Sequence, residues 1–446
     1  MKAAKPKLTY TQIIVLFFAA VIAVGTFLLC LPIASKSREW TPLLDSAFTA
    51  TSATCVTGLI VYDTFTHWSL FGQLIILSMI QIGGLGVMTI ITMFSVFAKK
   101  KISLHERKLL MQSAGTIRTN GIIKLLKQII TITLICEGAG AILLATRFCP
   151  EFGISKGLYY SVFHAVSAFC NAGFDLMGVY GKFSSITPFC SDITVNLTIC
   201  ALITSGGLGF IVWQDVITNK LRFKKYSLHS KIVLITSAVL LLSGWLFFFI
   251  FEYSSSLDGL TVGEKILASF FQSVSSRTAG FNTVPLNKLS AAGIMLMSTL
   301  MLIGGSPGST AGGIKTTTVA VMLIELIAAA KGNKDTVFFK RRLEDDTVKR
   351  AGAIISVYLL AVITSLMVIC AVEKLPLADV LFEVASAAGT VGLTVGITSS
   401  LTSISHIILI LLMFAGRIGG LTLIIAFAER REHAKLTRPV EKILIG

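Results

Sequence analysis

The chain has 446 residues, of which 54% are hydrophobic and only 14% are charged. Soluble domains carry about 25% charged residues, so this composition excludes an ordinary soluble protein and favours an integral membrane protein. The formal net charge of +16 would suggest a nucleic-acid partner in a soluble chain, but the positions of the basic residues argue against one.

The basic residues are concentrated in alternate loops. Of the 39 Lys and Arg residues, 28 fall in the segments 1–8, 99–127, 220–231, 331–350 and 430–442. Cytoplasmic loops of membrane proteins carry such an excess of positive charge. The pattern therefore predicts a multi-pass protein with both termini in the cytoplasm and an even number of spans. Membrane orientation explains the basic loops better than nucleic-acid binding does.

Long apolar runs follow one another along the chain. The first, 13–31, is longer than the apolar core of a signal peptide, which has about 7–15 residues, so we interpret it as a retained helix. Three further runs contain no charged residue, namely 69–98, 232–251 and 352–372. Each is long enough to cross a bilayer, which needs about 20 apolar helical residues.

Four short stretches repeat along the chain: DSAFTATSATCVTGL, YYSVFHAVSAFCNAGF, ASFFQSVSSRTAGF and DVLFEVASAAGTVGL. They align on the glycines Gly58, Gly173, Gly280 and Gly392, and a phenylalanine precedes each glycine by ten residues (Phe48, Phe163, Phe270 and Phe382). A serine lies six residues before the glycine in three copies (Ser52, Ser167 and Ser386), whereas the third copy has Val274 between two serines. Internal repeats of this kind indicate repeated structural units.

Each copy has the same surroundings. A long apolar run is followed by a run of about 12 residues that ends at the glycine, and then by a second long run. Runs of 10–14 residues are too short to span and indicate re-entrant helices. We therefore predict an all-α integral membrane protein with eight transmembrane helices and four re-entrant pore helices. They form four pseudo-symmetric modules around one pore, at residues 1–100, 101–220, 221–335 with a broken second helix, and 336–446 with a C-terminal tail.

The segments at the four glycines are candidates for a cation filter. Non-helical backbone at membrane depth is tolerated only where it is buried in protein or lines a water-filled space. Rings of backbone carbonyls can replace the hydration shell of a potassium ion. The predicted K⁺ ligands are Val56, Thr57, Gly58, Asn171, Ala172, Gly173, Thr278, Ala279, Gly280, Thr390, Val391 and Gly392.

The stretch IGGSPGSTAGGIKTTT, residues 303–318, raises the possibility of a phosphate-binding loop. Gly308 and Gly313 have the spacing of that motif, but Ile314 follows and Lys315 comes one position late. The preceding segment is an apolar span, whereas the motif requires a strand before the loop. The sequence therefore predicts no nucleotide on this chain.

The same stretch is better explained as a break in the second span of the third module. Glycines and a proline interrupt a helix, and the freed backbone must then meet water or protein. We predict a gate below the filter made of Gly304, Gly305, Ser306, Pro307, Gly308, Ser309, Thr310, Ala311, Gly312 and Gly313. Glycine pairs recur at 82–86, 205–209 and 417–421, where close helix packing is an alternative explanation.

Arg417 is assigned to the same gate. It lies 25 residues after Gly392, at a depth similar to that of the loop. A buried intramembrane arginine costs at least about 2.5–3.5 kcal/mol, so such residues commonly have a function. Two interpretations remain open: a positive barrier bound to loop carbonyls, or an arginine paired within the bundle with Glu137 or Glu325.

Other polar residues have less defined expectations. Glu383 and His164 follow the module phenylalanine and are expected to brace the filter from behind. Asp63 and Arg277 are expected to flank the outer mouth, and Lys315 to lie at the cavity edge. The eight cysteines form no CxxC pair and are best explained as small buried hydrophobic residues.

Thr390-Val391-Gly392-Leu393 is similar to the TVGYG filter of potassium channels, and the four glycine-centred modules resemble the Ktr/Trk/HKT superfamily of potassium transporters, in particular its KtrB-like membrane subunits. The resemblance covers nearly the whole chain. It implies one pore per chain, a homodimer in the bacterial plasma membrane, and an intramembrane gate loop with a nearby arginine. It also implies a cytoplasmic, KtrA-like RCK ring that binds nucleotide, and a C-terminal tail at the dimer contact.

The resemblance also bears on selectivity. In plant relatives a serine at the first filter position goes with sodium preference, so Gly58 implies potassium. A Na⁺- or H⁺-coupled secondary transporter of low K⁺/Na⁺ selectivity is the alternative, since such transporters also contain broken helices. An enzyme is not expected, because the sequence offers no nucleophile–base pair, metal-ligand cluster or cofactor motif.

Overall fold

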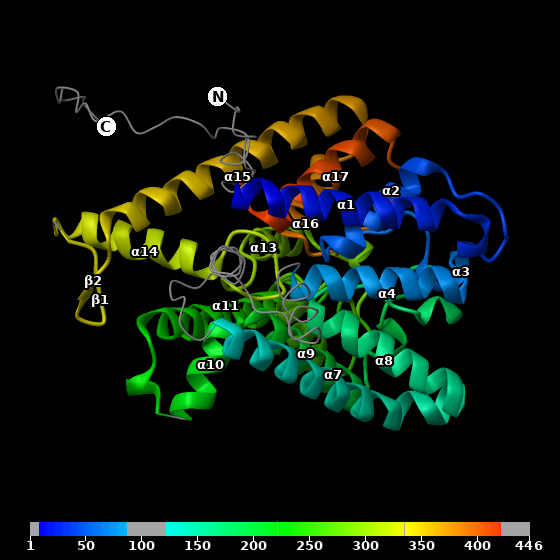
Figure 1. Cartoon of the computed structure of the whole chain (residues 1–446), viewed down its shortest axis with the longest axis horizontal. Helices are drawn as coiled ribbons and strands as arrows, with labels where there is room; N and C mark the ends of the chain where they lie inside the picture. Colours follow the sequence, from blue (N-terminus) through cyan, green and yellow to red (C-terminus); the bar gives the residue numbers. More distant parts are fainter. Residues whose placement is uncertain (1–8, 87–121, 221, 334, 421–446) are drawn as a thin grey trace, which may run out of the picture.

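The computed structural model describes residues 9–86, 122–220, 222–333 and 335–420. The basic segments 1–8 and 430–442, most of 99–127, and the C-terminal tail expected at the dimer contact lie outside the described residues. Within the described part the fold is almost entirely helical (Figure 1).

Four long apolar helices begin the four repeats. They are α1 (Tyr10–Cys30), α7 (Ile122–Phe152), α11 (Leu228–Glu252) and α15 (Asp345–Val372). All four are long and apolar enough to cross a membrane. The start of α1 is fixed by a reciprocal capping box between Thr9 and Gln12, and the start of α11 by the Ser227 side chain, which accepts from the Ser230 amide.

A shorter helix follows each long one. These helices are α2 (Leu43–Thr54), α8 (Ile154–Cys170), α12 (Val262–Ser275) and α16 (Leu377–Gly389). At 1.5 Å per residue they are about 18–26 Å long, less than a bilayer core of about 30 Å. Their carboxyl-terminal halves are buried, so each one points into the protein and ends there.

The second helix of each repeat is also short. These helices are α4 (Leu70–Leu85), α9 (Ile193–Gly207), α13 (Ala291–Leu302) and α17 (Ser403–Ile418). Each ends at or near its glycine pair. Gly86, Gly209 and Gly419 have φ values of 75°, 89° and 95°, and glycine adopts such positive φ values without a steric penalty.

The eight full spans expected from the sequence are not confirmed by the described helices, and the residues after α4 and α17 lie outside the described part. Four helices qualify as spans, or five if α9 and α10 (Phe210–Asn219), which bend by 97°, are counted as one. The sequence predicted one broken second helix, in the third module. The structure breaks the second helix after the glycine pair in the second repeat as well, and α13 is separated from α14 (Thr316–Ala330) by the 303–315 loop.

The helices pack as a closed ring. Each long helix packs against the short helix that follows it: α1 on α2, α7 on α8, α11 on α12 and α15 on α16. The second helix of each repeat packs against the short helix of the next repeat, as α4 does on α8, α9 on α12 and α13 on α16. The ring closes because α17 packs against α2. The ends of the four short helices are thereby held around one centre.

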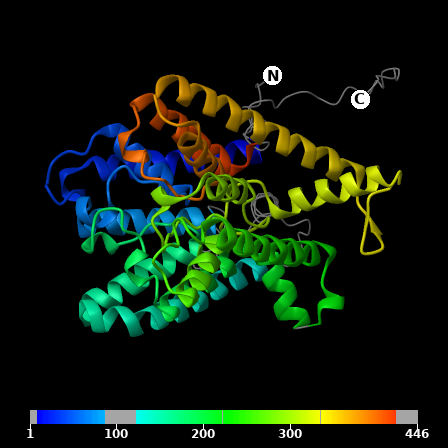
Figure 2. The same cartoon turned by 180° about the vertical axis from the view of Figure 1, so that it is seen from behind.

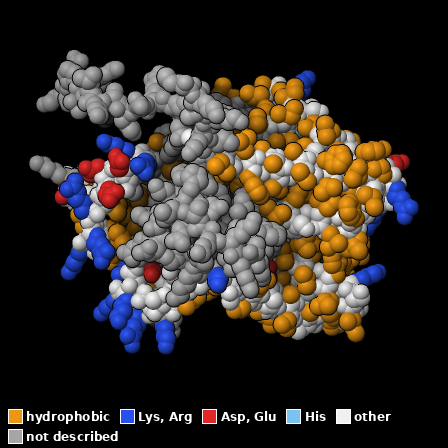
Figure 3. All heavy atoms as spheres, viewed as in Figure 1, with side chains coloured by type: hydrophobic (Ala, Val, Ile, Leu, Met, Phe, Trp, Pro, Cys, Tyr) orange, Lys and Arg blue, Asp and Glu red, His pale blue; other side chains and the backbone are white. Residues whose placement is uncertain are grey.

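The remaining elements are short. They comprise α3 (Thr64–His67), the 3₁₀ turns Pro32–Ala34, Met177–Val179, Thr187–Phe189, Phe223–Lys225, Leu286–Lys288 and Thr398–Ser400, and the hairpin β1 (Val337–Phe338) and β2 (Arg341–Arg342). Figure 2 shows α14, α15 and the hairpin projecting together at one end of the molecule. Lysines and arginines gather toward that end in Figure 3, while hydrophobic side chains cover wide areas of the rest of the described surface.

Candidate functional site

The four repeat glycines meet at one point. A Cβ added at Gly58 would lie 2.5 Å from the carbonyl oxygen of Ala172 and 3.3 Å from the Cα of Gly392. One added at Gly280 would lie 3.0 Å from the Cα of Gly173 and 3.4 Å from that of Gly392. Each glycine therefore faces glycines of two other repeats, and any side chain here would collide with backbone.

The backbone takes the same path in all four copies. Each glycine has positive φ, with 99° at Gly58, 71° at Gly173, 81° at Gly280 and 94° at Gly392. Two residues earlier, a non-glycine residue also has positive φ: Val56 at 57°, Asn171 at 61°, Thr278 at 75° and Thr390 at 52°. Such backbone is rare for side-chain-bearing residues and persists only where its surroundings hold it.

Serine side chains hold this backbone in place. In the first copy the Ser52 hydroxyl accepts from the Gly58 amide at 3.0 Å, and in the fourth Ser386 accepts from the Gly392 amide at 3.0 Å. All four residues are buried at these bonds, so removing a hydroxyl would leave an amide without a partner. The serine six residues before the glycine thus has a physical role in both copies.

The second and third copies use the serine differently. Ser167 donates to the carbonyl of Phe174 at 2.7 Å, and Ser275 donates to the corresponding carbonyl of Phe281. The sequence alignment put Val274 at the serine position of the third copy. The structure shows that Ser275 takes this role.

The third copy is one residue shorter between its bracing serine and its glycine. The amide of Ala279 bonds the carbonyl of Ser275, four residues back, whereas the amides of Thr57, Ala172 and Val391 each bond a carbonyl five residues back. The alignment of Phe270 with the other module phenylalanines is consequently wrong by one residue. Phe271 is the fully buried ring, and Phe270 is only partly buried.

Two threonine hydroxyls in these segments are buried without a partner among the described atoms, those of Thr57 and Thr390. Thr278, by contrast, is bonded to the Asn171 side-chain amide at 3.1 Å. Buried oxygens without a partner, beside converging carbonyls, are suited to an oxygen-seeking monovalent cation.

The 303–315 loop is fixed to the second repeat by backbone bonds. The amides of Ser306 and Thr310 donate to the carbonyls of Gly207 and Gly206, at 3.0 and 3.2 Å. The carbonyl of Gly308 accepts from the first amide of α10 at 2.9 Å. The loop therefore occupies the place where α9 breaks.

The same loop lies directly below the glycine ring. The Thr310 hydroxyl donates to the carbonyl of Phe169, near the end of α8, at 3.1 Å. A Cβ added at Gly312 would lie 2.1 Å from the hydroxyl oxygen of Thr390. The Lys315 ammonium donates to the loop's own carbonyls at Ala311, 2.6 Å away, and Gly312, 3.4 Å away.

Arg417 binds carbonyl oxygens of two other repeats. Its guanidinium donates to the carbonyl of Thr310 in the loop and to those of Gly83 and Gly84 at the end of α4, the last at 3.2 Å. The sequence does not identify Gly83 and Gly84 as acceptors. Their carbonyls are available to the guanidinium because they lie in the last turn of their helix.

Neither carboxylate considered as a partner of Arg417 is bonded to it. Glu137 accepts from the Gln81 amide at 3.1 and 3.3 Å. Glu325 accepts from the Thr336 hydroxyl. The structure thus shows the contact with a loop carbonyl that the first interpretation requires, and the role of a positive barrier stays a prediction.

Glu383 and His164 bind the segments that leave the ring. The Thr394 hydroxyl donates to Glu383 at 2.8 Å, and Thr398 donates to its other carboxylate oxygen. The Leu176 amide donates to Nε2 of His164 at 3.3 Å. Both buried side chains thereby hold residues two or more positions beyond a repeat glycine, Glu383 through hydroxyl groups and His164 through a backbone amide.

The carboxylates on the outer side differ in their surroundings. Asp63 is buried and accepts from the amides of Thr66 at 2.7 Å and Phe183 at 2.9 Å, so it joins the loops of two repeats. Burial raises the pKa of Asp175 to about 7, although the Met177 amide bound to its carboxylate opposes the shift.

Arg277 does not flank the outer mouth, so that expectation is wrong. Its guanidinium lies 3.4 Å from the Ser237 hydroxyl of α11, and it lines a small cavity with Gly207 and Gly305. The cavity that it shares with Gly305 of the 303–315 loop places this arginine on the loop side of the ring.

The family model for TrkH, described as a cation transport protein, matches residues 7–438. The chain is 40% identical to the potassium/sodium uptake protein NtpJ of Enterococcus hirae, over 100% of this chain and 99% of that protein. It is 39% identical to the Ktr system potassium uptake protein B of Bacillus subtilis, over 99% and 97%.

The fold has a solved counterpart. The potassium transporter TrkH from Vibrio parahaemolyticus superposes with a TM-score of 0.74 at 18% identity, covering 95% of this chain and 86% of that one. The apolar helices, the repeated glycine segments and these matches agree. The chain belongs to the TrkH family of cation transport proteins, a family of membrane transporters.

Proposed function

We propose that this chain is a channel-like subunit of a bacterial potassium uptake system, and that potassium passes through the ring at Gly58, Gly173, Gly280 and Gly392. The observation that carries the proposal is the meeting of four equivalent backbone segments, with matching positive φ values, at one buried point. Rings of carbonyls in such a place substitute for the hydration shell of the ion.

Potassium is the proposed cargo, with no nucleotide bound to this chain. Two curated relatives that match nearly the whole chain are named for potassium uptake, and one of those names also includes sodium. The buried hydroxyls of Thr57 and Thr390 add two oxygen ligands without requiring any acidic side chain. The four short helices also direct their negative carboxyl-terminal ends at the ring, which favours a cation.

The loop and Arg417 are proposed to close the pore below the ring. The loop binds the second repeat through backbone bonds, while Arg417 binds the loop to the first. A charge in this position opposes the passage of a cation until the loop and arginine move together. Glycine-rich backbone suits such a device, since it can change conformation at low steric cost.

The proposal also covers the orientation of the chain in the membrane and its partners. The basic end of the molecule is placed in the cytoplasm of a bacterium, with both termini on that side of the plasma membrane. A homodimer in membrane lipid, controlled by a cytoplasmic nucleotide-binding ring, is proposed from the resemblance to KtrB-like subunits.

Flux measurements on the purified protein in liposomes test the function. Uptake of K⁺ should exceed that of Na⁺, and it should continue without a sodium or proton gradient if the pore is channel-like. A strict requirement for either gradient would support the secondary-transporter alternative and overturn the channel-like part. Equal uptake of the two ions would overturn the selectivity.

The gate is tested separately by Arg417→Ala. Removing the guanidinium frees the carbonyls of Thr310, Gly83 and Gly84, so potassium flux should rise or lose its control. Arg350→Ala is the matched control, because Arg350 is an exposed arginine of α15 whose nearest carboxylate, on Asp346, is 3.5 Å away. Unchanged flux and unchanged regulation in Arg417→Ala would refute the gate.

A further inference from the structure

A groove runs between α9 and α11, with α12 as its floor. The floor helix packs closely against both neighbours, whereas α9 and α11 are not packed closely against each other. At one end of this groove is a cavity of about 550 Å³, lined by Ile193 and Leu197 of α9, Trp245 of α11, and Ile266, Leu267 and Phe270 of α12. Its walls are therefore almost entirely apolar.

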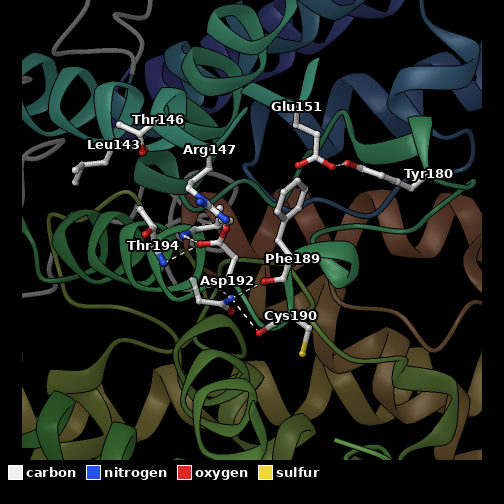
Figure 4. Close-up of polar contacts among 11 residues, drawn as sticks. Leu143, Thr146, Arg147, Glu151, Tyr180, Phe189, Cys190, Asp192 and Thr194 are labelled. Atoms are coloured by element: carbon white, nitrogen blue, oxygen red, sulfur yellow. Dashed lines mark hydrogen bonds and ion pairs between the residues drawn. The ribbon is translucent and has the colours of Figure 1, made fainter. Parts of the chain in front are cut away.

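The polar lining residues lie at one end of the cavity, where α9 and α12 begin. They are Ser191, Thr261 and Glu264, which are called the rim below. Figure 4 shows how the adjoining start of α9 is fixed: Arg147 of α7 donates to Asp192 at 2.5 Å, and the other oxygen of that carboxylate caps the helix. The groove thus has a polar entrance on a held helix end and an apolar interior.

The same helix faces continue toward the centre of the protein. On α11, Ser237 and Leu241 precede Trp245 at steps of four residues, and such steps share one face of a helix. They line a second cavity of about 20 Å³, which also contains Arg277 and Gly305. This second, separate cavity has room for about one water molecule and lies beside the 303–315 loop.

The outer surface around the groove faces lipid. Ile193, Leu242 and Val262 are 63%, 59% and 57% exposed, and each belongs to one of the three helices that form it. Exposed apolar side chains at this density are expected where a bilayer covers the protein. In the proposed orientation, the short helices begin at the outer side, so the polar rim lies at the outer headgroups.

We propose that this groove binds one acyl chain of an outer-leaflet phospholipid, with the headgroup at Ser191, Thr261 and Glu264. The match of polarity carries the choice of occupant: an amphiphile has a polar end for the rim and a thin hydrocarbon chain for the apolar interior. The proposal rests on the membrane orientation given under the proposed function. It places hydrocarbon along the floor helix, whose far end meets the glycine ring and the gate loop.

Trp245 reports on the occupant, because it lines the cavity and its indole N–H is fixed by a 3.1 Å bond to the carbonyl of Ile266. The protein is placed in liposomes with rising fractions of phosphatidylcholine brominated midway along its acyl chains. Bromine quenches indole fluorescence at contact. The part of the signal that Trp245→Phe removes belongs to Trp245, one of four tryptophans in the chain.

The expected result is quenching of the Trp245 signal that follows the occupancy of one exchangeable site. Leu197→Phe, which adds bulk inside the cavity, should lose most of that quenching. Leu246→Phe is the matched control, since Leu246 is 56% exposed on α11 and does not line the cavity. It should behave as the unaltered protein.

Two outcomes overturn the proposal. Equal quenching in Leu197→Phe and Leu246→Phe would mean that Trp245 meets only bulk lipid. An unquenched Trp245 that becomes quenched when the protein is diluted to monomers would assign the groove to a second copy of the chain. A protein that shows the expected quenching but carries no potassium would leave the lipid site standing and overturn the proposed function instead.

Discussion

Gly392→Ala should disable the ring of glycines. At φ = 94° an alanine carries a backbone strain of about 1–3 kcal/mol. Its Cβ would also lie 2.1 Å from the carbonyl oxygen of Thr57 and 2.8 Å from the Cα of Gly58. Ordinary contacts begin at 3.4 Å, so one backbone must move by about 1 Å. If roughly 2 kcal/mol of this cost falls on the ion-bound state, flux falls by more than about tenfold.

Gly396→Ala is the control that separates the effect of backbone strain from that of the steric clash. Gly396 has φ = 104° in the same segment, but a Cβ there would meet nothing within 4 Å. Both variants are compared by thermal unfolding and by rubidium uptake into liposomes. Both should be destabilised, and only Gly392→Ala should lose uptake. Full uptake by Gly392→Ala, or equal loss in both variants, would refute the reasoning.

Three further predictions follow from the same geometry. Gly58→Ser should raise the ratio of Na⁺ to K⁺ flux, because its side chain would enter the ring 2.5 Å from a carbonyl oxygen; an unchanged ratio would contradict a pore-lining position. Ser275→Ala leaves the buried Phe281 carbonyl without its hydroxyl donor, so the free energy of unfolding should fall by about 1–3 kcal/mol, and an unaltered melting temperature would speak against that brace. The pKa of Asp175 is raised to about 7, so this carboxylate gains a proton and loses its negative charge as the external pH falls below about 7. Potassium uptake should then decline, and Asp175→Asn should flatten the pH profile; the same profile in the variant would exclude Asp175 as its origin.

The repeats revealed the centre of the site because its chemistry recurs along the chain. Gly58, Gly173, Gly280 and Gly392 are needed for a physical reason that the sequence shows, namely backbone that other residues avoid. Their meeting point could be inferred from four matched modules. The loop at 303–315 could be placed below them because its position in the third module is fixed by the length of a helix.

Other features depend on contacts that no pattern records. The third copy has one residue fewer between its bracing serine and Gly280, so that serine is Ser275 instead of position 274, and only the hydrogen bonds show the shift. The partners of Arg417 are carbonyls, which every residue has, so the sequence could not select Gly83 or Gly84. The prediction for Arg277 was wrong because its position in the sequence shows only that it lies near the ring. It does not show whether the guanidinium points to the outer side or to the loop side.

The contact between α17 and α2 has a consequence for how the chain assembles. The first short helix acquires its last neighbour from the other end of the described chain, after the second and third repeats and the first two helices of the fourth have been made. During synthesis, α2 can pack on α1 and α4. The side of α2 that α17 covers stays exposed to the bilayer until residues 403–418 have been synthesised. Contacts this distant in sequence are slow to form, so completion of the ring is a late and all-or-none event in biogenesis. A chain interrupted before its last helix would contain three of the four second helices and still have an open circle.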